Sequence, residues 1–226
     1  ANNAIFAHFS KGLGLKGSCL VSPFEHPSVI DSAKYWFDQI IIYMPTDGKG
    51  LVNLNETSSI LEKEKISLVS LMAANNETGV LQPWQELAEV CSRNGGYFHC
   101  DATQWVGKLD TSGLSNCGSF SASAHKFCGP KGVGWLATKA PVKMQLGGAQ
   151  EFGLRGGTEN YPAIASMMVA FKDAQDRISE VNSRALWRDE FDKGIYFGAD
   201  GLVIPLNAGR PKVVTSRLGY FFECGP

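Results

Sequence analysis

The feature that most constrains this chain is the alternation of short apolar runs with segments of helical periodicity. The segments expected to be helical lie at about 28–37, 57–64 and 82–93, and in the last of them Trp84, Leu87, Val90 and Cys91 lie on one face. The runs expected to form strands lie at 18–22, 40–44, 67–73, 97–101, 119–123 and 133–137. This order is typical of an α/β fold, in which a mostly parallel mixed sheet is covered by helices on both faces.

The C-terminal part of the chain departs from this pattern. A glycine-rich loop at 147–157 precedes a long helical pattern at about 161–196, which is continuous or contains a break. Two weaker strands are expected at 202–205 and 217–222. We therefore expect a large domain over 1–199 and the beginning of a smaller α+β domain over 200–226. The chain opens at Ala1 without a methionine and ends just after a strand-like run. We expect it to be a piece of a longer protein.

Composition and charge argue against several functional classes. With 21 basic and 22 acidic side chains, the net charge is -1, so the chain has no excess of positive charge with which to bind nucleic acid or an anionic membrane. No apolar run approaches the ~20 residues of a membrane span, and the 226 residues contain no signal or transit sequence. The six cysteines are scattered without metal-ligand spacing, so we expect no metal and free thiols. We expect a cytoplasmic protein, with an organelle matrix as the alternative because a targeting peptide can precede Ala1.

Polar side chains follow four of the expected strands at the points where these strands are expected to end. They are His26, Asn76, Asp101 with Gln104, and Lys126. In sheets of this kind, ligands bind beyond the carboxyl ends of the strands. The sequence therefore predicts a ligand site that these side chains share.

Lys126 stands at the corner between two expected strands, just before a Gly-Pro-Lys-Gly turn. On the preceding strand, Phe120 and Ala122 lie on one face and the serines at 119, 121 and 123 on the other. An amine held near hydroxyls and an imidazole is a candidate nucleophile, best known for Schiff bases with carbonyls such as pyridoxal phosphate (PLP). The alternative is a solvated lysine on a surface hairpin.

PLP requires further groups, and the chain offers a candidate for each. The pyridinium nitrogen needs an anionic partner; Asp101 could provide it, or could instead cap the following helix. His26 could stack on the ring and move protons, or could cap or pack at a helix start. Asn76 could bond the ring hydroxyl or the substrate carboxylate, or could form an Asx-turn.

The remaining candidates concern the ring hydroxyl and the phosphate. Ser123 and His125 flank the lysine and could hold the phosphate, with ordinary strand-end hydrogen bonds as the alternative. Gln104 could bond the ring hydroxyl or be an exposed residue of a first helical turn. Thr158 precedes the long helix and could bind phosphate, cap the helix, or do both. No single residue is diagnostic, but their order along the chain favours a PLP site.

In this order, the motifs resemble those of the cysteine desulfurases, within the class V aminotransferase group of fold-type I PLP enzymes. The resemblance covers nearly all of residues 1 to about 175, at the family's spacing. The motifs that carry it are Glu-His-Pro-Ser-Val at 25–29, Met-Ala-Ala-Asn-Asn-Glu-Thr-Gly at 72–79, His-Cys-Asp-Ala-Thr-Gln-Trp-Val-Gly-Lys at 99–108, Ser-Ala-Ser-Ala-His-Lys at 121–126 and Leu-Arg-Gly-Gly-Thr-Glu-Asn at 154–160.

The resemblance implies a role for each candidate. Lys126 would form the Schiff base with PLP and later move the substrate's α-proton, and His26 would stack on the ring and take part in acid–base steps. Asp101 would pair with the pyridinium nitrogen, and Asn76 would lie beside the ring hydroxyl and the substrate carboxylate. The roles implied for the others are ring-hydroxyl binding by Gln104, phosphate binding by Ser123 and His125, and contact of Thr158 with the phosphate of the partner subunit in a homodimer.

The activity that the resemblance implies is conversion of L-cysteine to L-alanine. Sulfur would pass to an enzyme persulfide and on to an acceptor protein such as an iron–sulfur scaffold, or into thio-modification. The family's Gly-Thr-Glu phosphate turn, nucleophilic cysteine loop and carboxylate-binding arginine lie outside this chain, and neither Cys128 nor Cys224 matches the sulfur-accepting position. The alternatives are another class V PLP enzyme (a selenocysteine lyase, a carbon–sulfur lyase or a transaminase) and a non-catalytic scaffold homologue.

Overall fold

The fold is organised around one six-stranded sheet. The computed structural model describes residues 1–12, 17–37, 40–180, 183 and 186. Within them, the strands follow the order β2-β1-β3-β4-β5-β6 across the sheet. Their bounds are Ser18–Val21 (β1), Ile41–Tyr43 (β2), Ile66–Ser70 (β3), Tyr97–Asp101 (β4), Ser119–Ser123 (β5) and Gly134–Thr138 (β6).

The sheet is parallel from β2 to β5, and β6 pairs with β5 in the antiparallel sense. The β3–β4 pairing continues beyond the end of β3, because the backbone N–H groups of Leu71 and Ala73 donate to the carbonyls of His99 and Asp101 at 3.1 and 2.9 Å. A parallel neighbour needs a crossover connection, whereas β6 follows β5 through a short turn that contains Lys126. The predicted mostly parallel mixed sheet is confirmed.

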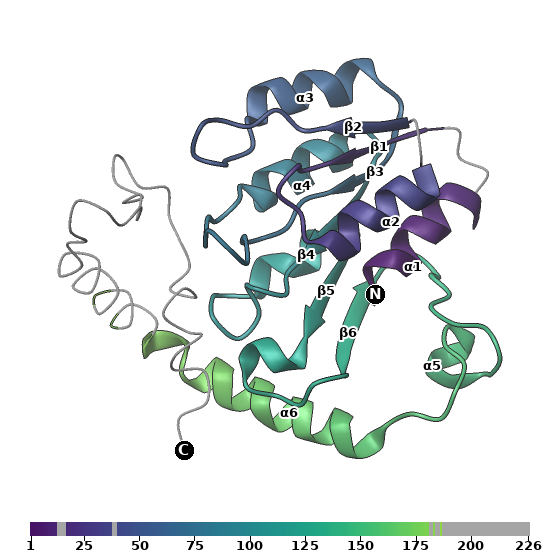
Figure 1. Ribbon diagram of the computed structural model, residues 1–226, viewed down its shortest axis with the longest axis vertical. Coiled ribbons are helices and arrows are strands. Elements are labelled where there is room, and N and C mark those ends of the chain that lie inside the picture. Colours follow the sequence, from purple (N-terminus) through teal and green to yellow (C-terminus); the bar gives the residue numbers. More distant parts are fainter. Residues whose placement is uncertain (13–16, 38–39, 181–182, 184–185, 187–226) are drawn as a thin grey trace, which may run out of the picture.

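Helices cover both faces of this sheet (Figure 1). Two helices at the N-terminal end of the chain, α1 and α2, pack together on one face, and α3 and α4 pack on the other. Helix α6 lies along the β5–β6 side, against the turn that carries Lys126. The helix bounds are Asn2–Ala7 (α1), Pro27–Phe37 (α2), Leu54–Lys63 (α3), Trp84–Arg93 (α4), Gln150–Gly153 (α5) and Tyr161–Asp176 (α6).

The core has two layers because side chains alternate across each strand. In β1, Cys19 and Val21 pack with Phe6 and the other residues of α1 and α2, whereas Leu20 packs with Trp84 and the residues of α3 and α4. All five of these side chains are almost completely buried. Burying one large apolar side chain contributes roughly 1.5–3 kcal/mol. The two layers therefore hold the strands, and with them the polar residues at their carboxyl ends, in fixed register.

Several element boundaries differ from the sequence-based expectation. Helix α3 begins at Leu54 rather than near Thr57, because Asn53 caps it by accepting from the N–H groups of Asn55 and Glu56. In the long helical pattern expected from 161, the alternative with a break is confirmed: α6 ends at Asp176 and a 3₁₀ turn, Ile178–Glu180, follows. Beyond this turn only residues 183 and 186 are described, and both are helical. The predicted domain over 200–226 lies outside the described residues. Among the described residues, no helix has both the length and the apolar character that crossing a membrane requires.

Candidate active site

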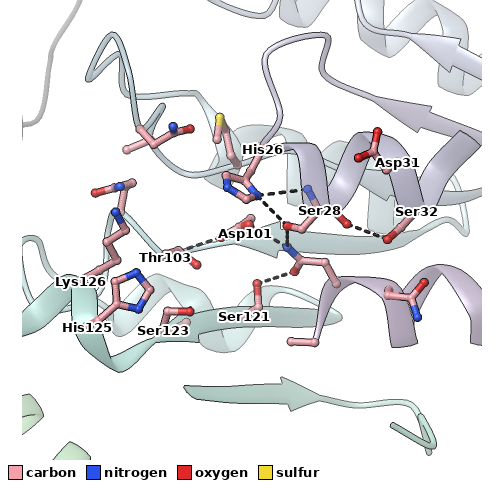
Figure 2. A pocket seen from close by; sticks show the side chains of 18 of the residues that line it. His26, Ser28, Asp31, Ser32, Asp101, Thr103, Ser121, Ser123, His125 and Lys126 are labelled. Atoms are coloured by element: carbon pink, nitrogen blue, oxygen red, sulfur yellow. Dashed lines mark hydrogen bonds between the residues drawn. The ribbon is translucent and has the colours of Figure 1, made fainter. Parts of the chain in front are cut away.

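A cavity of about 760 Å³ lies at the carboxyl edge of the sheet. Figure 2 shows Asp101 between His26 on one side and the corner with Ser123, His125 and Lys126 on the other. Seven of the eight residues singled out from the sequence line this cavity: His26, Asn76, Asp101, Gln104, Ser123, His125 and Lys126. The structure therefore brings together side chains from four strand ends that are up to 100 residues apart in the chain.

Lys126 sits in a 3₁₀ turn, Ala124–Phe127, directly after β5. Its carbonyl accepts a hydrogen bond of 2.7 Å from the Nζ of Lys108, which ties the turn to the segment after β4. Gly107, with φ of +75°, allows this approach, because a Cβ there would lie 2.5 Å from the Cβ of Phe127. Cys128 ends the turn in the left-handed region, with φ of 64°. The corner that holds the lysine is thus fixed from both sides.

Gln104 is buried, with 5 % of its surface exposed. Its Oε1 lies 3.5 Å from the Nζ of Lys108, which occupies the amide's acceptor side. The amide nitrogen of Gln104 is therefore the atom that remains to donate into the cavity. The alternative that Gln104 is an exposed first-turn residue is wrong.

Asp101 is the last residue of β4, and only 6 % of it is exposed. One carboxylate oxygen accepts from the N–H of Thr103 at 3.0 Å, and the other accepts from the Nδ2 of Asn2 at 2.9 Å. Among the described side chains, the structure pairs this carboxylate with no cation. The local turn bond to Thr103, foreseen as the capping alternative, is present, but it engages only one of the two oxygens.

His26 directly precedes helix α2, and its carbonyl accepts from the N–H groups of Val29 and Ile30. Its ring Nδ1 accepts from the N–H of Ser28 at 3.1 Å and lies 2.8 Å from the Ser28 hydroxyl. Because Nδ1 accepts, the proton of the neutral ring is on Nε2. His26 therefore caps through its backbone while its exposed ring lines the cavity.

The Asx-turn considered for Asn76 and the helix cap considered for Thr158 are both made by a nearby asparagine instead. The Asx-turn after β3 is made by Asn75, whose Oδ1 accepts from the N–H groups of Glu77 and Thr78, so Asn76 is left to line the cavity. The cap of α6 is Asn160, whose side chain accepts from Ala163, so the capping alternative for Thr158 is wrong. Thr158 is exposed and does not line the cavity of its own chain.

The structure adds polar residues that the sequence reasoning missed. Asn2, Ser28 and Ser121 line the cavity and are linked by hydrogen bonds, and His99 lies buried behind them. For His99 a sequence signal existed, because it lies two positions before Asp101 and thus on the same face of β4. For Asn2 the spacing gives no such signal, since it precedes Asp101 by 99 residues. Among the described residues, no cluster of His, Cys, Asp or Glu is suited to a metal ion.

Two buried groups beside Asp101 have displaced pKa values. Burial lowers the pKa of His99 to about 4, although the charge of Asp101 opposes this shift. Burial raises the pKa of the Glu25 carboxyl well above its usual range, and the charge of Asp101 raises it further. The nearby Met72 backbone and Ser70 hydroxyl only partly offset the rise, and neither Glu25 oxygen has a partner with hydrogen-bond geometry. Burial thus favours the neutral form of both groups, and the neutral ring of His99 supplies no positive charge to balance Asp101.

Glu25→Gln is expected to stabilise the cofactor-free protein increasingly as pH rises. With its pKa raised in the folded state, Glu25 binds more protons folded than unfolded above the unfolded pKa of about 4.3. The contribution of Glu25 to the free energy of unfolding therefore falls with rising pH, by at most about 1.4 kcal/mol per pH unit. Glutamine does not titrate, so the variant avoids this loss.

Chemical denaturation between pH 4 and pH 8 measures the effect. The exposed Glu62→Gln on α3 is the control for removing one carboxylate. A difference between Glu25→Gln and the wild type that stays constant over this range would show that Glu25 ionises freely in the folded protein.

Comparison with known proteins identifies the relatives of this chain. The model of the family described as aminotransferase class-V matches residues 1–185. A cysteine desulfurase IscS of Clostridium botulinum is 37% identical over 176 residues, which are 75% of this chain and 44% of that protein. A mitochondrial cysteine desulfurase of Candida maltosa is 40% identical over 150 residues, 62% of this chain and 31% of that protein.

The fold comparison agrees with these relatives. The X-ray structure of a NifS-like protein from Rickettsia africae matches with a TM-score of 0.75 and 30% identity, over 85% of this chain and 53% of that one. The chain spans less than half the length of the two curated relatives. Since the family model covers most of the 226 residues, and since the fold and the motifs agree with it, the chain belongs to the class V aminotransferase family.

Proposed function

We propose that this chain forms the cofactor-binding part of a PLP-dependent cysteine desulfurase, which converts L-cysteine to L-alanine. The observation that carries the proposal is that Lys126 and Asp101 line one cavity at the carboxyl edge of the sheet. The relatives named as cysteine desulfurases support the substrate. When bound, PLP supplies the electron sink for chemistry at the α-carbon of an amino acid.

The residues present fit PLP. A buried carboxylate is costly unless its charge is balanced. Asp101 is buried and is paired with no cationic side chain among the described residues, so the protonated ring nitrogen would balance it. Gln104 would donate its amide N–H to the ring hydroxyl, and Ser123 and His125 would hold the phosphate. Lys126 would bind the aldehyde and move the α-proton, and His26 would stack on the ring. Asn76 would lie beside the substrate carboxylate.

Loss of sulfur from cysteine requires a thiol that accepts it, so that the carbon–sulfur bond breaks and a persulfide forms. Of the described cysteines, 19, 91, 100 and 117 are buried and 128 is exposed, and none of them lines the cavity. In this proposal the accepting thiol therefore belongs to another part of the protein. An acceptor such as an iron–sulfur scaffold would take the sulfur from it.

We propose a homodimer on the strength of the segment around Thr158. This segment exposes large apolar side chains, with Leu146 79%, Phe152 101% and Tyr161 76% exposed. Apolar surface of this kind is typical of interaction sites. In a dimer, Thr158 would reach the phosphate in the partner subunit. For the compartment we propose the cytoplasm or an organelle matrix; the named relatives include a mitochondrial protein.

The test is product analysis with L-cysteine as the sole amino acid, using the full-length protein with PLP and a thiol reductant. We expect alanine and sulfide in equal amounts, without consumption of an added keto acid. Amino transfer to the keto acid would identify a transaminase instead. Faster release of selenium from selenocysteine, without sulfide from cysteine, would identify a selenocysteine lyase. Absence of any cofactor-dependent product would support the scaffold alternative.

A further inference from the structure

Asn2 is a buried amide at the start of helix α1, facing the polar side of β4 and β5. Its Nδ2 donates to the Oδ2 of Asp101 at 2.9 Å and to the Oγ of Ser28 at 3.0 Å. Its Oδ1 accepts from the Oγ of Ser121 at 2.7 Å and lies 3.0 Å from the Nε2 of His99. A side-chain amide has two donor hydrogens and two acceptor lone pairs. All four hydrogen-bonding positions of Asn2 are therefore occupied.

The orientation of the Asn2 amide is fixed by chemistry. A carboxylate only accepts hydrogen bonds, so the atom that faces Asp101 must be the nitrogen and the opposite atom must be the oxygen. The oxygen in turn accepts from His99, so the Nε2 of His99 carries a proton. The neutral imidazole then accepts at Nδ1, and the hydroxyl of Ser119, 2.9 Å away, donates to it.

The sheet register explains why these groups meet. His99 pairs with Ser119 and Asp101 pairs with Ser121 across β4 and β5, so all four point to the side of the sheet that faces α1. This side contains polar groups that must find partners because they are buried. Asn2 enters between them from α1 and, among the described residues, is the one that bonds three of the four.

We propose that Asn2 is the positioning residue of this site: its amide aims the Asp101 carboxylate at the cavity and holds His99 as the neutral Nε2–H tautomer. The same amide reaches the other side of the cavity, since Ser28 accepts from Asn2 and contacts the ring Nδ1 of His26. One residue of α1 thereby links the two groups that would contact opposite parts of the cofactor ring. Asn2 itself acts through Asp101 and His26.

This arrangement keeps the negative charge on the two oxygens of the Asp101 carboxylate. A protonated His99 beside Asp101 would neutralise the carboxylate internally and compete with a cationic ligand. Because Asn2 presents an oxygen to His99 and an N–H to Asp101, the carboxylate receives hydrogen bonds while its charge stays available to the cavity. The part of this inference that concerns the cofactor rests on the proposed function, whereas the part that concerns His99 does not.

The first test is NMR of ¹⁵N-histidine-labelled full-length protein stripped of PLP. In the wild type we expect His99 to show the Nε2–H pattern at pH 7 and to titrate with a pKa of about 4. In Asn2→Asp, a carboxylate replaces the amide between His99 and Asp101, so we expect the His99 titration to move to about 6.5 or above. An Nδ1–H tautomer or an imidazolium in the wild type at pH 7 would overturn the proposal, and this measurement needs no variant to fold.

The second test is the affinity for PLP, followed by the absorbance of the bound cofactor. Asn2→Ala removes one hydrogen bond to a charged group, so we expect the affinity to fall roughly 10- to 100-fold. The control is Gln82→Ala, which removes another buried amide, one that bonds Val52 and Gly50 outside the cavity. Gln82→Ala is expected to leave PLP affinity and the His99 signals unchanged.

The outcomes separate the two proposals. Equal PLP affinity of Asn2→Ala and the wild type would overturn the positioning role while leaving the proposed function intact. A wild type that binds no PLP would contradict the proposed function, and the tautomer of His99 would still decide the role of Asn2.

Discussion

Replacing Lys126 by alanine is expected to lower the rate of L-cysteine desulfuration roughly 10³-fold or more. Lys126 is the one cationic side chain among the residues that line the cavity, apart from the two histidines, and it stands at the end of β5 opposite His26. Alanine removes the amine that would bind the cofactor and move the α-proton, but it keeps the backbone that accepts from Lys108. Loss of activity should therefore come without loss of the fold.

Two further substitutions make the Lys126 result specific. Lys126→Arg keeps a positive charge, but the guanidinium stays protonated and cannot act as a nucleophile, so it is expected to be as inactive as alanine. Lys131→Ala removes an exposed lysine in the following turn and is expected to retain full activity. Alanine and sulfide production, with circular dichroism for the fold, measures all three. An active Lys126→Ala or Lys126→Arg variant would remove Lys126 from the chemistry.

Asp101→Asn is expected to lower kcat by about 10²–10³-fold, the loss of about 2.7–4 kcal/mol typical for removing one buried electrostatic group that stabilises a transition state. Asparagine has nearly the same shape and can still accept from the N–H of Thr103. It lacks the charge that would keep the ring nitrogen protonated, so the electron sink becomes weaker. The cofactor should still attach to Lys126, and the loss should appear in removal of the α-proton.

The matched control for this prediction is Asp110→Asn. Asp110 also accepts hydrogen bonds from a turn, through the N–H and hydroxyl of Ser112, but it is exposed and outside the cavity. Exchange of the α-hydrogen of cysteine with deuterated solvent measures proton removal directly. Wild-type exchange in Asp101→Asn would contradict the assigned role, as would equal losses in the two variants.

Much of the fold is encoded locally. The alternation of Phe120 and Ala122 with three serines predicts both the strand and its two faces, and the structure places the first two in the core and the serines on the polar side. His26, Asn76 and Asp101 follow parallel strands, and the carboxyl ends of parallel strands lie at the same edge of the sheet. Their shared position is therefore also predictable from the sequence. These predictions need only the period of each segment and the order of segments.

Other features depend on contacts that periodicity does not encode. Asn2 meets Asp101 only because α1 packs over β4 and β5, and no local pattern relates two residues 99 positions apart. The choice between neighbours is also unpredictable from composition: Asn75 rather than Asn76 makes the turn, and Asn160 rather than Thr158 caps α6. In each pair both residues have suitable side chains, and the backbone geometry selects one of them.

The most direct test of the central claim is to locate the cofactor on the chain. The native full-length protein would be reduced with borohydride, digested and mapped by mass spectrometry. We predict a phosphopyridoxyl group on the peptide that contains Lys126, and on no other lysine peptide. An unmodified Lys126 peptide, or modification at another lysine, would contradict the assignment of this cavity as a PLP site.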